Sequence, residues 1–161
     1  MSRLMAVSLI LGTVLSGIIA HAEQSGPTAP ATSRQETHQR TTAMKISIRT
    51  EHKVISATLA DNPTSWDFVS LLPITLTLKD YAGTEKVGDL PRRLSTEGAP
   101  AGSDPSIGDI AYYSPWGNVA IFYRNFRYSR GLIKLGKIDA GIEALNVPES
   151  TKVTIELSEK H

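Results

Sequence analysis

The stretch that decides the fold reads I-A-Y-Y-S-P-W-G-N-V-A-I-F-Y and runs from residue 110 to residue 123. Two runs of β-favouring residues flank a short polar segment at 114–118. Pro115 suits the second position of a turn, and Gly117 can adopt the positive φ that closes a hairpin. The stretch therefore predicts two antiparallel strands joined by a tight turn.

Alternation along these strands divides the side chains between two faces, because successive residues of a strand point in opposite directions. One set comprises Ile110, Tyr112, Val119, Ile121 and Tyr123. The opposite set includes Tyr113, Phe122 and Arg124. We expect one set to fill the protein interior and the other to point outward, where its aromatic rings would form a groove.

Working outward from the hairpin, apolar residues alternate with polar ones in five further segments, which read as strands. These segments are 45–49, 55–59, 74–79, 132–138 and 153–157. One short helix is predicted after Asn62, ending at Pro73, and a second after Asp139, reaching Leu145. Residues 82–106 read as a long connection. About seven short antiparallel strands with two short α-helices predict a mostly β fold, a closed antiparallel barrel.

The N-terminal region reads as a targeting segment followed by a tether. Residues 1–22 combine an early arginine, an apolar run and an Ala20-His21-Ala22 end, which predicts a cleaved secretory signal peptide. The apolar run is shorter than a membrane span, which disfavours a permanent membrane anchor. Residues 23–43 are polar and read as a flexible linker, which leaves 44–161 as the folded domain. A periplasmic or secreted location is expected.

Composition and residue content exclude several kinds of site. A net charge of +1 gives no reason to expect nucleic acid as a partner. Without cysteine there is no thiol nucleophile or thiolate metal site, and too few histidines remain for a catalytic triad or a histidine metal site. No cofactor-binding motif occurs. Four aspartates near loop ends, Asp80, Asp89, Asp104 and Asp109, are expected mainly to cap turns.

The order of predicted elements resembles the cyclophilin barrel, and several short motifs are similar to the bacterial cyclophilin-like domain family. These motifs are Asp61-Asn62-Pro63, Leu71-Leu72-Pro73, Lys86-Val87-Gly88-Asp89-Leu90-Pro91, Gly108-Asp109-Ile110 and Pro115-Trp116-Gly117-Asn118. The segment 135–145 also resembles the cyclophilin stretch in which a Gly-Lys-Val strand end leads into a short helix. The resemblance implies a closed cyclophilin-like barrel over about 44–157.

Prolyl isomerase activity, which the resemblance brings with it, depends on an arginine, a glutamine and an apolar aromatic pocket. Arg92 and Arg93 are the nearest counterparts of the arginine, although the usual Phe does not follow them. Phe122 matches the aromatic position, whereas Ala120 stands where the glutamine is expected. The resemblance therefore implies the aromatic half of that site without its polar half.

The predicted ligand site combines the aromatic hairpin with nearby arginines: Tyr113, Trp116, Phe122, Tyr123, Arg124, Arg92 and Arg93. Two interpretations of the rings stay open. They either pack beneath the connections at 82–106 and 124–131, or form a pocket in which Arg124 or Arg127 holds an anionic or carbonyl group.

Three functions follow from these alternatives. The first is an exported module that binds a peptide or small molecule in an aromatic groove. The second is a peptidyl-prolyl isomerase with a degenerate site, in which no covalent step is needed because the barrier is rotational. The third is an accessory domain for a flavodoxin-like redox protein, since similar domains occur beside such domains. The sequence sets neither the ligand nor the oligomeric state.

Overall fold

The structure is a computed structural model that describes residues 43–147 and 149–158. The predicted signal peptide and all but the last residue of the predicted linker lie outside these residues, so both stay predictions. In the described part of the chain, neither helical segment has the length and apolar character needed to cross a membrane.

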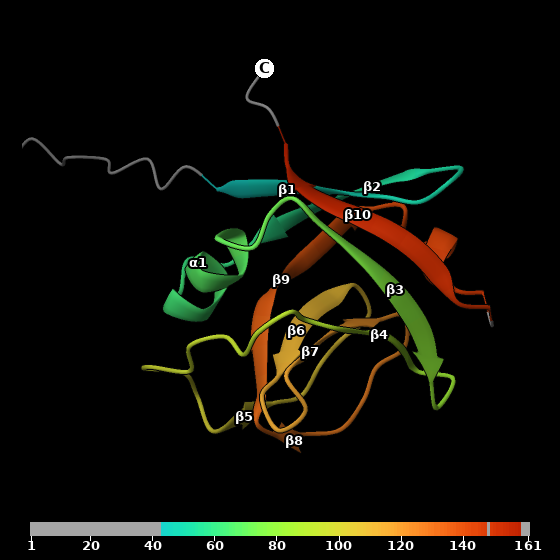
Figure 1. Cartoon of the computed structure of the whole chain (residues 1–161). Helices are drawn as coiled ribbons and strands as arrows, with labels where there is room; N and C mark the ends of the chain where they lie inside the picture. The colour runs from blue at the N-terminus through green and yellow to red at the C-terminus, as the bar shows by residue number, and fades with distance from the viewer. Residues whose placement is uncertain (1–42, 148, 159–161) are drawn as a thin grey trace, which may run out of the picture. The chain divides into compact units, whose positions relative to one another are not determined.

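Eight strands close into an antiparallel barrel, which confirms the predicted fold class (Figure 1). Around the barrel the strands follow the order β1, β10, β3, β4, β7, β6, β9, β2. Their bounds are β1 Met44–Arg49, β2 Val54–Leu59, β3 Ile74–Tyr81, β4 Glu85–Asp89, β6 Asp109–Tyr113, β7 Asn118–Phe122, β9 Leu132–Ala140 and β10 Thr151–Leu157. A separate two-stranded ribbon pairs β5, Gly102–Ser103, with β8, Ser129–Arg130.

The quoted hairpin forms as predicted. β6 and β7 pair in antiparallel register, with Tyr113 opposite Asn118. Gly117 has a φ of 74°, and its N–H donates to the Tyr113 carbonyl, which closes the turn. The inward-facing set is buried in the barrel core: Ile110, Tyr112, Val119 and Ile121.

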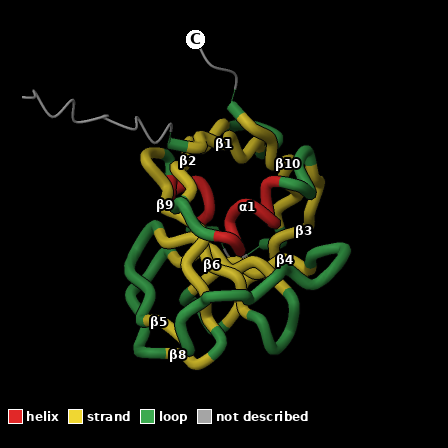
Figure 2. Tube along the Cα trace, turned by 90° about the vertical axis from the view of Figure 1, so that its left-hand side faces the viewer, coloured by secondary structure: helices red, strands yellow, loops and turns green. Residues whose placement is uncertain are grey.

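Each end of the barrel is closed by a helical segment, and both are visible inside the ring of strands in Figure 2. Helix α1, Pro63–Val69, follows the end of β2 and buries Phe68 in the core. The 3-10 turn η1, Ile142–Leu145, begins beside Ile55 at the other end of β2 and buries Leu145. Burial of these two side chains completes the core where the strands diverge.

The two predicted helices differ from the observed ones in extent and in capping. Asn62 caps α1 through a 2.8 Å bond from the Ser65 N–H, as predicted, but the helix ends at Val69 rather than at Pro73. The N-cap predicted for the second helix, Asp139, was wrong. Asp139 lies within β9, where its carboxylate binds Lys45 and Thr58, and η1 begins after Gly141 with no side-chain cap.

The predicted long connection at 82–106 contains a barrel strand. β4 occupies 85–89 and pairs with β3 on one side and β7 on the other. Its inward-facing positions are Lys86 and Gly88, so the apolar alternation typical of a strand is missing. The remainder of the connection carries β5, whose pairing with β8 lies outside the barrel (Figure 1).

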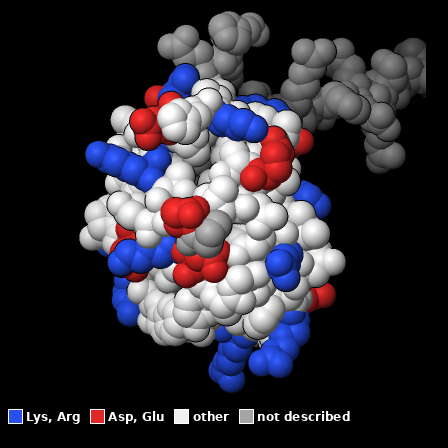
Figure 3. All heavy atoms as spheres, turned by 90° about the vertical axis from the view of Figure 1, so that its right-hand side faces the viewer, with Lys and Arg blue, Asp and Glu red and all other residues white. Residues whose placement is uncertain are grey.

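The charged side chains on the face shown in Figure 3 are mixed in sign. Over the described residues of this face, lysine and arginine are interspersed with aspartate and glutamate among wide uncharged areas. This distribution agrees with the near balance of 17 basic and 16 acidic residues in the chain.

Candidate functional site

The candidate site lies on the outer side of the barrel wall formed by β4, β7, β6 and β9. Here the side chains that point away from the main core form a second apolar cluster. Its buried members are Ala111, Ala120, Phe122 and Leu132, with Val87 and Tyr113 packed against them. Alternation along the hairpin thus produces two apolar surfaces, one inside the barrel and one outside it.

A pocket of about 200 Å³ opens over this outer cluster. Phe122 is completely buried at its base, while the rings of Tyr81, Trp116 and Phe126 reach solvent around it. Trp116 is 57% exposed, although a large apolar side chain usually has more of its surface covered. Exposed rings grouped around a pocket are typical of a binding surface. The structure combines parts of both interpretations, since Phe122 is buried whereas Trp116 and Phe126 are exposed around a pocket.

The Trp116 ring stands between two tyrosines. Its centroid is 5.5 Å from that of Tyr81 and 5.3 Å from that of Tyr113, with interplanar angles of 81° and 82°. Edge-to-face contacts of this kind are favourable. All three rings line the pocket.

Among the polar residues that line this apolar space, Glu85 is the one whose pKa is shifted. Burial raises the pKa of the Glu85 carboxyl to about 7, because the pocket replaces water around the charged form. Asn118 also lines the pocket, but its side-chain oxygen is fully buried, without a hydrogen-bond partner in the described part of the chain.

Of the seven predicted ligand-site residues, the structure brings three together in the pocket: Tyr113, Trp116 and Phe122. Tyr123 follows the end of β7 and turns away from these rings. Its hydroxyl donates to Asp80 at 2.5 Å, and burial, reinforced by that bond, raises the Tyr123 pKa to about 12. The same hydrogen bond lowers the pKa of Asp80, which also lies 3.6 Å from the buried Lys86 ammonium. Tyr123 therefore belongs to a structural polar network.

Arg124 and Arg127, expected to hold an anionic group, do not line the pocket. Arg124 is exposed, and its backbone N–H donates to Thr84. The Arg127 guanidinium lies 5.6 Å from the centre of the Phe126 ring, a cation–π contact on the outside of a pocket ring.

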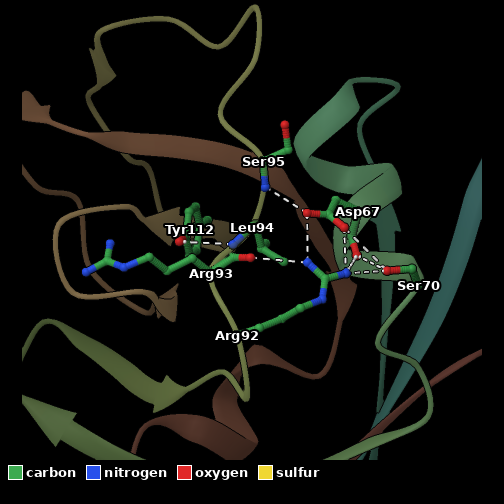
Figure 4. A network of polar contacts seen from close by, with 7 residues as sticks. All are labelled: Asp67, Ser70, Arg92, Arg93, Leu94, Ser95 and Tyr112. Atoms are coloured by element: carbon green, nitrogen blue, oxygen red, sulfur yellow. Dashed lines mark hydrogen bonds and ion pairs between the residues drawn. The ribbon is translucent and has the colours of Figure 1, made fainter.

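Arg92 is held by α1 (Figure 4). Its guanidinium donates to the Asp67 carboxylate at 2.6 and 3.0 Å and to the Ser70 hydroxyl at 2.7 Å. The hydrogen bond from Arg92 is the main cause that lowers the Asp67 pKa to about 2, and the Ser95 N–H adds to it. A guanidinium with these partners fixes the 90–95 segment to the helix.

Arg93 extends to the opposite side of the same segment, as Figure 4 shows. It donates to the carbonyl of Ser114 at 2.6 Å and to that of Pro115 at 3.3 Å. These carbonyls belong to the turn that carries Trp116, so Arg93 positions a pocket wall without lining the pocket. Next to it, the Leu94 N–H donates to the Tyr112 hydroxyl at 3.1 Å.

Sequence reasoning missed four residues that shape the pocket. Tyr81 ends β3 beyond the predicted strand 74–79, Glu85 begins β4 within the predicted connection, and Phe126 lies in the connection at 124–131. Asn118 was placed in the hairpin turn and in a family-like motif, without a role of its own. Their grouping depends on β4 lying between β3 and β7, and no local pattern indicated that strand.

The turn-capping role expected for Asp109 is confirmed. Its carboxylate accepts the Ser106 N–H at 3.0 Å, and its second oxygen lies 2.7 Å from the Lys134 ammonium. Among residues 43–147 and 149–158, no three potential ligands from His, Asp and Glu gather as a metal centre would require. Glu85 is the only ionisable acid of the pocket lining other than the tyrosine phenols, so the described site lacks the paired carboxylates of glycosidase-type chemistry.

Comparison with known proteins agrees with this architecture. A sequence model of the cyclophilin-like family matches residues 48–156. The solution structure of a hypothetical protein from Archaeoglobus fulgidus superposes with a TM-score of 0.56 at 20% sequence identity, over 75% of this chain and 99% of that one. At this identity the likeness concerns the fold alone. No curated protein matches the chain.

Proposed function

The chain belongs to the cyclophilin-like family, and from this premise we propose that it is a non-catalytic binding module whose ligand enters the aromatic pocket. The observation that carries the proposal is the group of exposed rings around a preformed apolar base. Trp116, Tyr81 and Phe126 surround the buried Phe122, and the edge-to-face contacts of Trp116 fix two of the walls. Rigid rings reduce the entropy lost on binding.

The pocket volume limits what can enter. About 200 Å³ is below the roughly 300–1,000 Å³ typical of sites for drug-sized ligands. The ligand is therefore either a small molecule or one side chain of a peptide. Because the sequence begins with a predicted signal peptide, with cleavage after Ala22, we propose that binding takes place in the periplasm or outside the cell. Mass spectrometry of protein recovered from the periplasm should then give a chain that starts at Glu23.

Tryptophan fluorescence tests the binding proposal, because one of the two tryptophans of the chain lies at the pocket and the other, which is similarly exposed, lies on α1. Trp66 is 55% exposed on α1 and Trp116 is 57% exposed at the pocket. In a Trp66→Phe variant, the remaining emission reports on the pocket alone. We expect saturable changes with members of a panel of small amines, alcohols and N-acetyl amino acid amides. The emission of the matched Trp116→Phe variant should not change with the same compounds. If no compound of the panel changes the emission of either variant, the support for binding is removed.

Prolyl isomerisation is a second candidate, favoured by one observation. Phe122, the counterpart of the cyclophilin aromatic residue, forms the base of a pocket large enough for a proline ring. Against it, Ala120 is buried in the outer cluster where the glutamine is expected, and Arg92 is held by Asp67. A protease-coupled assay with an Ala-Pro peptide decides between the two, and no acceleration at micromolar protein would end this candidate.

A further inference from the structure

The charged group and the rings that line the aromatic pocket share one electrostatic preference. Among the described residues of the lining, Glu85 is the only side chain with a formal charge, and that charge is negative. Aromatic rings present negative faces, which attract cations. Both features favour a positively charged ligand.

The register of the strands places these groups along one surface. Glu85 lies opposite Phe122 on the neighbouring strand, so the carboxyl stands beside the ring at the pocket base. Asn118 lies opposite Asp89, four residues further along the same pair of strands, roughly 13 Å away at the usual strand rise. A compact ligand beside Glu85 therefore contacts the ring at the pocket base and does not reach Asn118.

We propose that this pocket binds a small organic cation, an ammonium compound, with its charged group among the rings beside Glu85. The inference rests on the proposed binding function and gives its ligand a charge. It reverses the expectation of an anionic ligand, since the arginines that were to hold such a group lie outside the pocket lining. The limited volume suits a compact head group on a short stem.

The ionisation of Glu85 gives the proposal a pH dependence. Burial raises its pKa to about 7, and only the carboxylate attracts a cation, so affinity should increase as the pH rises through neutrality. The other titratable groups facing it are the phenols of Tyr81 and Tyr113, with Tyr123 beside them and Arg124 following. Lys86 and Asp80 bind each other in the polar network behind this surface.

The decisive experiment compares cations with neutral compounds of the same shape. Calorimetric titration of the full chain at pH 8 would use choline against 3,3-dimethylbutan-1-ol, and n-butylammonium against 1-butanol. We expect each cation to bind about 3- to 10-fold more tightly than its neutral partner, because the Glu85 carboxylate and the ring faces both attract the charge. Equal or tighter binding by the neutral compound in both pairs would overturn the inference. In that case the proposed binding function would be retained. If none of the four compounds bound, the result would count against the binding function itself.

A variant and a change of pH test the role of Glu85 separately. In Glu85→Gln the advantage of each cation should fall to about twofold, the part that the rings supply, while the neutral compounds bind as before. In the unchanged protein the advantage should decrease about 2- to 5-fold between pH 8 and pH 6, and this decrease should be absent in the variant. A cation advantage that neither the variant nor the pH alters would contradict the assignment of Glu85.

Discussion

Arg92 and Arg93 are adjacent in the sequence, yet each stabilises a different part of the structure. Arg92 binds α1 through Asp67 (Figure 4), and Arg93 donates to carbonyls of the turn that carries Trp116. Both were predicted as ligand residues because an arginine in this region would match the isomerase site. The hydrogen bonds show instead that their guanidinium groups hold the segment 90–95 between the helix and the hairpin.

The Asp67–Arg92 pair should make stability depend on acid. The Asp67 pKa is lowered from an ordinary value of 3.8 to about 2, chiefly by the Arg92 hydrogen bond. A lowered pKa in the folded state stabilises the fold above the ordinary value, and that stabilisation is lost as the pH falls from about 4 to about 2. Because Arg92 is partly exposed, solvent screening reduces the contribution, and Asp67→Asn should cost about 1 kcal/mol at pH 7.

Urea denaturation at pH 7, 4 and 2.5 measures this effect. The difference in unfolding free energy between the unchanged protein and Asp67→Asn should shrink toward the lowest pH. The control is Asp104→Asn, which changes the charge equally at an exposed position. A deficit for Asp67→Asn that stays constant down to pH 2.5 would show that Asp67 does not act through its charge.

Single residues were predictable where their chemistry is conspicuous. Trp116 and Phe122 stand out as aromatics in a hairpin, and alternation placed Phe122 opposite the core-facing set. Glu85 could not be identified in the same way, because an isolated glutamate in a polar run resembles any surface residue. Its significance comes from the burial that raises its pKa, and that burial depends on rings distant in sequence.

At the scale of elements, strands were predictable when their inward positions are apolar. β4 is the exception, since Lys86 and Gly88 point inward. Lys86 tolerates burial because its ammonium donates to the carbonyls of Val147 and Glu149 and lies near Asp80. A buried lysine paired in this way cannot be distinguished from a surface lysine by periodicity.

Gly136 in β9 provides a test at the same scale. A Cβ there would overlap the carbonyl oxygen of Thr58 and lie 2.8 Å from Cα of Leu59, both backbone atoms of β2. Backbone atoms cannot move aside as a side chain can, so Gly136→Ala should destabilise the protein by about 2–4 kcal/mol. The sequence marked this glycine through its likeness to the cyclophilin strand end, but the close approach of β2 is a property of the closed barrel.

Gly98→Ala is the matched control. Gly98 has a φ of 68°, and a Cβ added there would meet no atom within 4 Å, so only the backbone preference opposes the substitution. Its expected cost is about 1 kcal/mol. Urea denaturation of both variants measures which of them loses more unfolding free energy. A Gly98→Ala variant as unstable as Gly136→Ala would contradict the role of the close approach.

For the whole molecule, the number of strands and the family resemblance sufficed to predict a closed barrel, whereas the strand order required the structure. The barrel closes because β10, the last strand, pairs with both β1 and β3. No local pattern indicates such long-range pairing. The pairing of β4 with both β3 and β7 brings the β3–β4 turn, with Tyr81 and Glu85, beside the strand that carries Phe122, so the pocket likewise depends on long-range pairing.

The role of β10 in closure leads to a prediction about two truncations. The compact unit that contains the barrel begins at Gln39. A fragment of residues 39–161 should therefore fold by itself and unfold within about 3 °C of the full chain, since a shift of that size corresponds to less than about 1 kcal/mol.

A second fragment that ends at Ser150 lacks β10, which exposes the edges of β1 and β3 and removes Val153 and Ile155 from the core. It should show no cooperative thermal transition. Circular dichroism during heating measures both fragments, and a cooperative transition in the fragment without β10 would show that barrel closure is not required for folding.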